Sequence, residues 1–231
     1  MQALIFAAGK GERMRPLTDH TPKPLLQVNG RALIDYHLEK LAEAGFTRVL
    51  INLAYLADTI EQHCGTGSRY GLHIDYSHEG PEPFETGGAI HHALPWFQDK
   101  AFAAISADVF TDLPFAQLTQ ALTAFTQSDA LAHLWLVNNP AHHPAGDFHL
   151  QHTLLDRSHQ PRLTYSGISL LKPQLVERFP DRRERFPLRD ALFWAMQHQR
   201  LTGQHWPGMW SDVGTPERLA RCQTLHTGAN H

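Results

Sequence analysis

The sequence contains little cysteine and no long apolar run. Its two cysteines, Cys64 and Cys222, are far apart and form no Cys-x-x-Cys pair, so neither a disulfide framework nor a thiolate zinc site is indicated. The N-terminus lacks a basic segment followed by a short apolar stretch, and no window of apolar residues is long enough to span a bilayer. We therefore expect a cytoplasmic protein that does not enter a membrane.

The sequence also lacks an excess of positive charge. It has 20 Lys and Arg against 23 Asp and Glu, which leaves no broad basic surface for nucleic acid. The pairs His91-His92 and His142-His143 consist of neighbours whose side chains diverge, so neither pair is expected to bind one metal ion. No low-complexity linker interrupts the 231 residues, which predicts a single domain, and the lack of an appended interface element favours a monomer.

The first half of the chain alternates between strand-like and helix-like segments. Strands are predicted at residues 3–6, 48–53, 74–77 and 102–106, and helices at residues 33–44, 57–63 and 88–94, the last ended by Pro95. Strands that alternate with crossover helices predict an α/β fold, a Rossmann-like three-layer sandwich with a mainly parallel mixed sheet. Ligands of such sheets bind at the carboxyl ends of the strands.

The second half is less regular. Strands are predicted at residues 131–137 and 165–171, helices at residues 117–126, 188–198 and 216–225, and a turn-rich passage at residues 138–147. The chain shows no internal repeat and no hexapeptide solenoid, so a C-terminal β-helix is not expected.

The most informative segment lies at the front of the chain. Leu4-Ile5-Phe6 runs into a glycine-containing turn at residues 7–16 that includes Arg13. A buried strand followed by such a turn can direct backbone N-H groups and guanidinium groups at oxyanions, which predicts a phosphate-bearing ligand. The spacing does not fit a P-loop, which needs a second glycine followed by Lys and then Ser or Thr. It does not fit a dinucleotide fingerprint either, because the third glycine of that motif is missing.

Four patches of the sequence fit one reaction. Arg13 and Lys23 suit the charge of a triphosphate, and the glycines of residues 85–88 would let a flat base approach the start of a helix. Asp108 follows an apolar strand, and Asp212 lies in a turn before the last helix. Two carboxylates that meet at one site would hold Mg²⁺ on phosphate oxygens, and no protein nucleophile would be needed.

Together these patches resemble those of the sugar-1-phosphate nucleotidylyltransferases, in residues 7–18, 22–25, 85–88, 108 and 212–216. The resemblance implies the nucleotide-diphospho-sugar transferase fold, in which residues 1–137 form mainly the nucleotide-binding core. Residues 138–231 would form the sugar-binding part and supply the second metal aspartate. Residues 36–38, 67–72, 139–143 and 146–148 make the chain most similar to a subgroup of uridylyltransferases that act in cell-wall recycling.

The resemblance implies UTP and a sugar 1-phosphate as substrates and Mg²⁺ as cofactor. The sugar phosphate would attack the α-phosphate of UTP and release pyrophosphate. The implied site residues are, for catalysis, Arg13, Lys23 and Asp108; for the nucleotide, Ala7, Ala8, Gly9, Gly11, Arg13, Lys23, Glu85 and Gly88; for the sugar, Gly146, Asp147, Ser166, Gly167 and Arg189; and for the metal, Asp108 and Asp212.

Two departures from the family pattern leave alternatives open. Ala107 stands where the family usually has glycine, and no Glu-Lys-Pro element precedes Tyr165. A mannose-1-phosphate guanylyltransferase or a glucose-1-phosphate thymidylyltransferase would share the phosphate motifs, and a nucleotide-sugar sensor would share the pocket without turnover. If the sugar is a muramate, a cation could bind its lactyl carboxylate, and the candidates are Arg162, Arg185 and Arg189.

Overall fold

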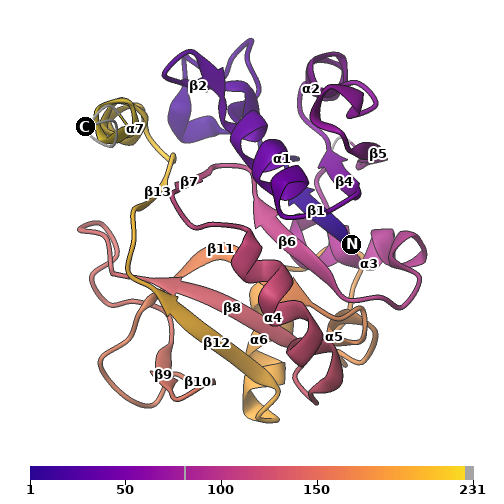
Figure 1. The fold of residues 1–231 in the computed structure, drawn as a ribbon, viewed down its shortest axis with the longest axis vertical. Helices are drawn as coiled ribbons and strands as arrows, with labels where there is room; N and C mark the ends of the chain where they lie inside the picture. The colour runs from indigo at the N-terminus through magenta and orange to yellow at the C-terminus, as the bar shows by residue number, and fades with distance from the viewer. Residues whose placement is uncertain (81, 227–231) are drawn as a thin grey trace.

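A computed structural model describes residues 1–80 and 82–226 of the protein, which form a nine-stranded sheet with helices on both faces (Figure 1). The sheet contains β1 (Gln2–Phe6), β4 (Arg48–Leu53), β5 (His73–His78), β6 (Phe102–Ser106), β8 (Ala132–Val137), β9 (His149–Gln151), β10 (Leu154–Asp156), β11 (Thr164–Leu171) and β12 (Leu201–Trp206). Two small pairs are β2 (Gln27–Val28) with β3 (Arg31–Ala32), and β7 (Val109–Thr111) with β13 (Trp210–Asp212). The helices are α1 (Leu33–Glu43), α2 (Ala57–Cys64), α3 (Glu85–Phe97), α4 (Ala116–Gln127), α5 (Gln174–Glu177), α6 (Leu188–Gln197) and α7 (Pro216–His226), with 3-10 turns η1 (Glu12–Met14), η2 (Lys23–Leu25) and η3 (Ser68–Tyr70).

The strands of one half of the sheet are all parallel, and the other half is mixed. The strand order is β5-β4-β1-β6-β11-β8-β12-β10-β9. The first four strands pair in parallel, and β8 and β12 run in the same direction as these four, whereas β11 is antiparallel to both of its neighbours. β10 and β9 form an antiparallel hairpin at the far edge. The predicted α/β class with a mainly parallel mixed sheet is confirmed.

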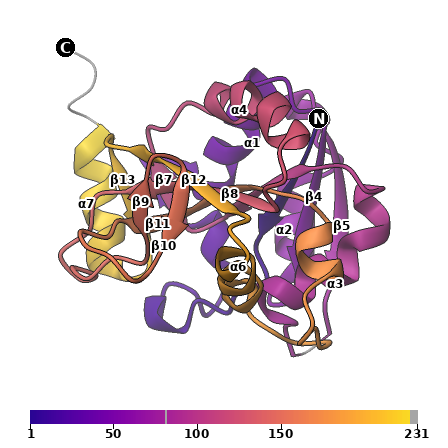
Figure 2. The same cartoon turned by 90° about the horizontal axis from the view of Figure 1, so that it is seen from below.

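Different helices cover the two faces of the sheet and so create three layers. One hydrophobic cluster joins the sheet to α1, α2 and α4, and a second joins it to α3, α5 and α6. Alternate residues of a strand point to opposite faces, so Ala3 and Ile5 of β1 belong to the first cluster and Leu4 belongs to the second. Figure 2 shows α1 and α4 on one side of the sheet and α6 on the other.

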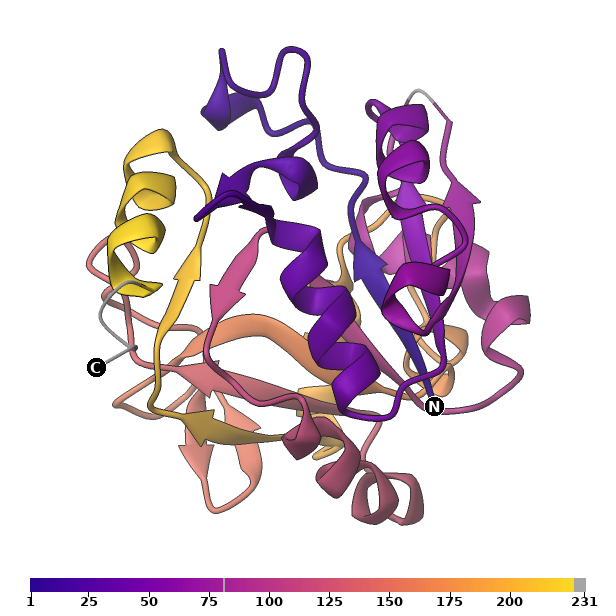
Figure 3. The same ribbon diagram turned by 45° about the horizontal axis from the view of Figure 1, so that its top comes forward.

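A third hydrophobic cluster lies beyond the sheet, where α7 packs near β2 and β13. Its buried residues include Met14, Val28, Phe110, Val213 and Cys222. Figure 3 shows α7, in yellow, on the side of the molecule where the indigo N-terminal segment lies. This cluster packs η1 and α7 into one buried group, through Met14 of η1 and Leu219 and Cys222 of α7.

Most elements predicted for the first half are present, but both predicted ends of one helix are wrong. The helix predicted at residues 88–94 starts earlier, at Glu85, and continues through Pro95 to Phe97. Proline removes one helix hydrogen bond, but Phe97 is fully buried and its ring stacks on that of Phe102, so packing favours the extra residues. In the second half, β12 and the β9–β10 hairpin are not predicted by the patterns, and residues 210–212, predicted in a turn, form β13.

The start of α3 packs directly against residues 184–186. The backbone N-H groups of Gly87 and Gly88 both donate to the carbonyl oxygen of Phe186, at 2.9 and 3.1 Å. A Cβ atom at Gly88 would lie 2.3 Å from the carbonyl oxygen of Glu184, and one at Gly87 would lie 2.4 Å from the Phe186 ring. Both glycines are therefore needed for the close approach of two protein segments.

The substitution Gly88→Ala should lower the free energy of unfolding by about 1–3 kcal/mol, because backbone atoms must move to admit the methyl group. Gly80→Ala is the matched control, since a Cβ atom there meets nothing within 4 Å, and its effect should stay within about 0.5 kcal/mol. Urea unfolding of both variants measures the difference. Equal stability of the two variants would show that residues 184–186 can move away from the added methyl group without a loss of free energy of unfolding.

Stability should also depend on pH through His37, which is fully enclosed on α1 and stacks beside Phe115. Burial, with the charge of Lys40 nearby, lowers the pKa of His37 to about 4. In the unfolded chain the pKa is about 6.5, so the unfolded state alone gains a proton as the pH falls below that value. The stability contributed by neutral His37 is therefore complete above about pH 6.5 and is lost between about pH 6.5 and 4.

We expect His37 to reduce the free energy of unfolding by about 2 kcal/mol between pH 7 and pH 5. The variant His37→Phe cannot titrate, so its unfolding free energy should fall by that much less over the same interval. Urea unfolding at the two pH values, with the difference taken within each protein, removes any constant effect of the larger ring. Parallel pH profiles would contradict a neutral buried His37.

Candidate active site

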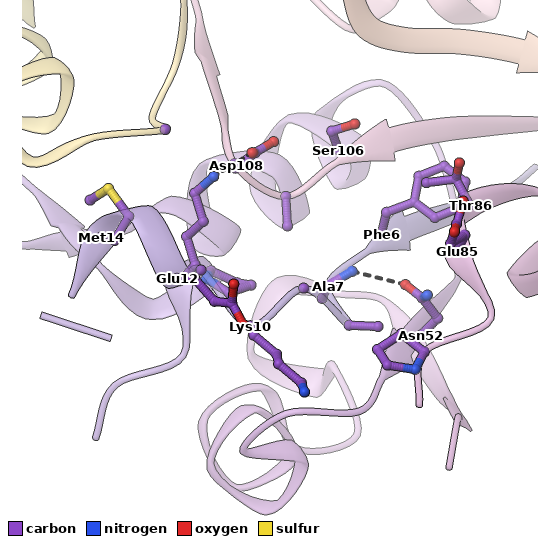
Figure 4. Close-up of a pocket in the computed structure, with 18 of the residues that line it drawn as sticks. Phe6, Ala7, Lys10, Glu12, Met14, Asn52, Glu85, Thr86, Ser106 and Asp108 are labelled. Carbon is purple, nitrogen blue, oxygen red and sulfur yellow. Dashed lines mark hydrogen bonds and ion pairs between the residues drawn. The ribbon is translucent and has the colours of Figure 1, made fainter. Parts of the chain in front are cut away.

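The carboxyl ends of three parallel strands form one row at an edge of the sheet. Phe6 of β1 lies opposite Asn52 of β4 on one side and opposite Ser106 of β6 on the other. All three residues line a hollow of about 660 Å³ that we call the first hollow (Figure 4). The expected position of a ligand, at the carboxyl ends of the strands, therefore coincides with a real cleft.

The turn after β1 forms one wall of the first hollow. The predicted nucleotide residues that line it are Ala7, Ala8, Gly9, Gly11, Arg13, Lys23 and Glu85. The N-H of Ala7 donates to Oδ1 of Asn52 at 2.8 Å, which anchors the turn to β4. Gly11 adopts a φ of +64°, and the Thr18 hydroxyl donates to its carbonyl oxygen at 2.8 Å. A side chain at Gly11 would be strained, so glycine keeps this turn compact.

The two predicted cations of the first hollow differ in what they contact. Lys23, on η2, forms an ion pair with Asp108. Arg13, on η1, is exposed, and within the described part of the chain it has neither a hydrogen bond nor an ion pair. Arg13 is therefore free to meet an incoming anion, as is Lys10, which also lines the first hollow and has no ion pair among the described residues.

Asp108 and Asp212 are brought together by the small β7–β13 pair. Asp212 lies opposite Val109, and the N-H of Val213 donates to the carbonyl oxygen of Asp108 at 2.7 Å. Both aspartates line a hollow of about 380 Å³, which we call the third hollow. Two carboxylates from distant parts of the sequence thus share one site, as the motifs predict.

Cations already neutralise both aspartates. Asp108 pairs with Lys23, and Asp212 contacts Nη1 of Arg218 at 3.0 Å and Nε2 of His142 at 3.0 Å. Carboxylate oxygens suit a hard divalent cation. Within the described residues, no group of three or more His, Cys, Asp or Glu side chains is arranged to hold a metal ion. An ion at this pair would need further oxygen donors, which the phosphates of a substrate can provide.

A second hollow, of about 770 Å³, adjoins the first on the other side of β6. It shares Phe6, Glu85, Thr86 and Ser106 with the first hollow. Of the predicted sugar residues, Asp147 and Arg189 line this second hollow, while Ser166 and Gly167 line the third.

Ser106 lies where the three hollows meet, because it lines all of them. Gly167 packs against it from β11. A Cβ atom at Gly167 would lie 2.8 Å from Oγ of Ser106, and the φ of Gly167 is +79°. The pairing of β11 with β8 shifts register between Tyr165 and Ser169, so the strand bulges at this point. The bulge brings Ser166 and Gly167 to the junction.

Two predicted site residues lie elsewhere, and a third has a packed methyl group. Gly88 does not line the first hollow; it meets Glu184, so the interpretation that it admits a base is wrong. Gly146 lines none of the three hollows; a Cβ atom there would lie 2.8 Å from the backbone of Arg162, so glycine at this position permits close packing of two protein segments. Ala107 lines the first hollow but is only 2% exposed, so its methyl group occupies core space and takes little room from a ligand.

The sequence patterns missed several residues of the cleft. Asn52 and Glu79 line the first hollow and are joined by a 2.6 Å hydrogen bond from Nδ2 of Asn52 to Oε1 of Glu79. A polar Asn52 inside an otherwise apolar strand was a usable signal. Tyr165 lines the second and third hollows, and burial raises its pKa to about 12, so its hydroxyl remains a donor at neutral pH. Arg157 lines the second hollow, but no sequence motif around it indicated a role in the site.

Comparisons with known proteins agree with this geometry. The family model described as nucleotidyl transferase matches residues 2–148. The chain is 43% identical over 97% of its length to N-acetylmuramate alpha-1-phosphate uridylyltransferase of Neisseria meningitidis serogroup B, and covers 98% of that protein. It is 31% identical over 93% of its length to the protein of the same name from Caulobacter vibrioides, and covers 92% of it.

A solved structure with the same fold comes from Bacillus anthracis and is named as a glucose-1-phosphate thymidylyltransferase in complex with sucrose. It superimposes with a TM-score of 0.86 at 19% identity, over 100% of this chain and 97% of that one. The resemblance predicted from the motifs is confirmed by the family match and by two relatives of nearly equal length. The chain belongs to the nucleotidyl transferase family.

Proposed function

We propose that the protein transfers a uridylyl group from UTP to N-acetylmuramic acid α-1-phosphate, giving UDP-N-acetylmuramic acid and pyrophosphate, as a cytoplasmic monomer in peptidoglycan recycling. The observation that supports this best is the meeting of three hollows at Ser106. A nucleotide fits the first hollow and a sugar the second, and the phosphates of both substrates would lie near the carboxylates of the third, where a divalent cation would offset the like charges. The names of the two full-length relatives identify uridine and muramate as the first choices.

In the proposed reaction, an oxygen of the sugar phosphate attacks the α-phosphorus of UTP. The bond from that phosphorus to the oxygen shared with the β-phosphate breaks, and pyrophosphate leaves with that oxygen. Arg13 and Lys23 would neutralise the charge on the leaving pyrophosphate. The chain supplies no covalent nucleophile, so positioning and charge stabilisation provide the catalysis.

Asp108 and Asp212 would hold a Mg²⁺ ion, since hard carboxylate oxygens and a nearby polyphosphate fit that ion. When bound, the ion supplies positive charge to phosphate oxygens. The ion pair between Lys23 and Asp108 keeps the lysine at the cleft. Arg218, only 13% exposed in its side chain, holds Asp212 in the same way.

The two parts of the chain would divide the substrates. Residues 1–137 supply most of the first hollow, and residues 138–231 supply Asp147, Tyr165 and Arg189 to the second. We assign the first part to the nucleotide and the second to the sugar and to the second metal aspartate.

A screen of pyrophosphate release tests the function. It crosses UTP, dTTP and GTP with the 1-phosphates of N-acetylmuramate, N-acetylglucosamine, glucose and mannose, in the presence of Mg²⁺. We expect the highest kcat/KM for UTP with the muramate. A higher value for GTP with mannose 1-phosphate, or for dTTP with glucose 1-phosphate, would favour those enzymes instead. Binding of UTP in calorimetry without any turnover would identify a sensor.

The carboxylate pair is tested by Asp108→Asn and Asp212→Asn. Each variant should lose at least about a hundredfold in turnover, as expected for loss of one preorganised electrostatic group. Asp58→Asn is the control, because Asp58 is exposed on α2 and lines none of the three hollows. Thermal unfolding is followed in parallel, since Asp212 also neutralises Arg218. Near-normal Mg²⁺-dependent rates in both folded variants would remove the aspartates from the site.

A further inference from the structure

The second hollow contains two cations, Arg157 and Arg189. N-acetylmuramic acid differs from N-acetylglucosamine by a lactyl ether, which adds one carboxylate to the sugar. An enzyme that selects the muramate needs a cation for that carboxylate, because an ionised group that leaves water without a partner loses much of its binding energy. The question is which cation remains available.

Of the three arginines suggested by the sequence, two lie outside the second hollow and the third already contacts an acidic side chain. Arg162 does not line the second hollow, and its guanidinium donates to the carbonyl oxygens of Arg157 and His159. Arg185 also lies outside it and contacts Glu82 at 3.3 Å and Glu85 at 3.7 Å. Arg189 lines the hollow, but its Nε lies 3.6 Å from Oδ1 of Asp190, so its charge already has an acidic neighbour.

Arg157 is different because its charge is not neutralised. Within the described part of the chain, no carboxylate lies within ion-pair distance of its guanidinium, whose recorded contact is the ring of Phe193 on α6, 4.5 Å from the centroid. Stacking on a ring holds a guanidinium by its face and leaves its N-H edges open. Those edges match a planar carboxylate in a bidentate pair.

The backbone of Arg157 is also held in place before any ligand binds. Oδ1 of Asp156 accepts the N-H groups of Ser158 and His159 at 2.8 and 3.0 Å, and Arg162 donates to the Arg157 carbonyl oxygen. Phe193 in turn packs edge-on against Phe148, next to Asp147. The backbone of Arg157 and the ring of Phe193 are thus each held by neighbouring residues in the wall of the second hollow.

We propose that Arg157, stacked on Phe193, binds the lactyl carboxylate and is the residue that selects muramate over glucosamine sugars. This inference rests on the proposed function, because it assumes that the second hollow holds the sugar. It replaces Arg162, Arg185 and Arg189 as the candidate for this role.

The test compares kcat/KM for N-acetylmuramate 1-phosphate and N-acetylglucosamine 1-phosphate, with UTP saturating, in the wild type and in Arg157→Gln. Loss of a charged hydrogen-bond pair should reduce the value for the muramate about 10–100-fold. The value for the glucosamine sugar, which lacks the carboxylate, should change less than about threefold, as should the KM for UTP. Arg157→Lys keeps the charge without the planar fork and should give an intermediate preference.

Two matched variants make the test specific. Arg189→Gln removes the other cation of the second hollow. Arg182→Gln removes an exposed arginine outside that hollow, whose side chain donates a hydrogen bond to the carbonyl oxygen of Glu177. Neither should change the preference by more than about threefold. If Arg157→Gln keeps the wild-type preference, or Arg189→Gln abolishes it, Arg157 is not the selecting residue.

Failure of the proposed function gives a different result from failure of the role assigned to Arg157. A wild type that does not turn over the muramate, or that prefers the glucosamine sugar, would overturn both the proposed function and the role of Arg157. A wild type that prefers the muramate, together with an unchanged preference in Arg157→Gln, would overturn the role of Arg157 alone. Titration calorimetry with N-acetylmuramate 1-phosphate gives the same comparison without turnover, and weaker binding only in Arg157→Gln supports the proposal.

Discussion

The cleft depends on strand register at one edge of the sheet. Phe6 pairs with both Asn52 and Ser106, so three strand ends stop at one level and leave a hollow beyond them. β11 runs in the opposite direction, and its beginning therefore reaches the same edge. Gly167 approaches Ser106 so closely that a Cβ atom would lie 2.8 Å from the hydroxyl. A shift of β11 by one residue would replace this glycine at the contact with a residue whose side chain would clash with Ser106.

Both aspartates of the cleft have cationic partners before any substrate arrives. Asp108 has Lys23 as its partner, and Asp212 has Arg218 and His142. Partly buried carboxylates without such partners would cost free energy, so these pairs allow two acids to share one site in the ligand-free protein. In contrast, Lys10, Arg13 and Arg157 line the hollows and have no ion-pair partner among the described residues. Uncompensated positive charge thus remains where phosphates and a sugar carboxylate would bind.

The parallel half of the fold could be predicted from the sequence, because β1, β4 and β6 are buried on both faces and are apolar runs ended by a turn. In the other half, β8 and β11 could be predicted, but β12 could not, since it mixes Gly203, Gln204 and His205 with apolar residues. The same limit applies to the site. Lys23 and the two aspartates lie in distinctive motifs, whereas the reason for glycine at position 88 depends on Glu184, which is distant in sequence. Long-range contacts of this kind leave no local pattern.

The two halves also impose different constraints on change. Strand ends that pair in register with β1 cannot move without disturbing the sheet. Such fixed positions suit the residues that would handle phosphates, a chemistry shared by the whole family. Arg157 instead follows β10, a three-residue strand of the outer hairpin, and is exposed. Side chains on such an edge can be replaced at little cost to the core. With Arg157 in the proposed role, the choice of sugar would lie where the fold tolerates substitution, and the chemistry of the phosphates where it does not.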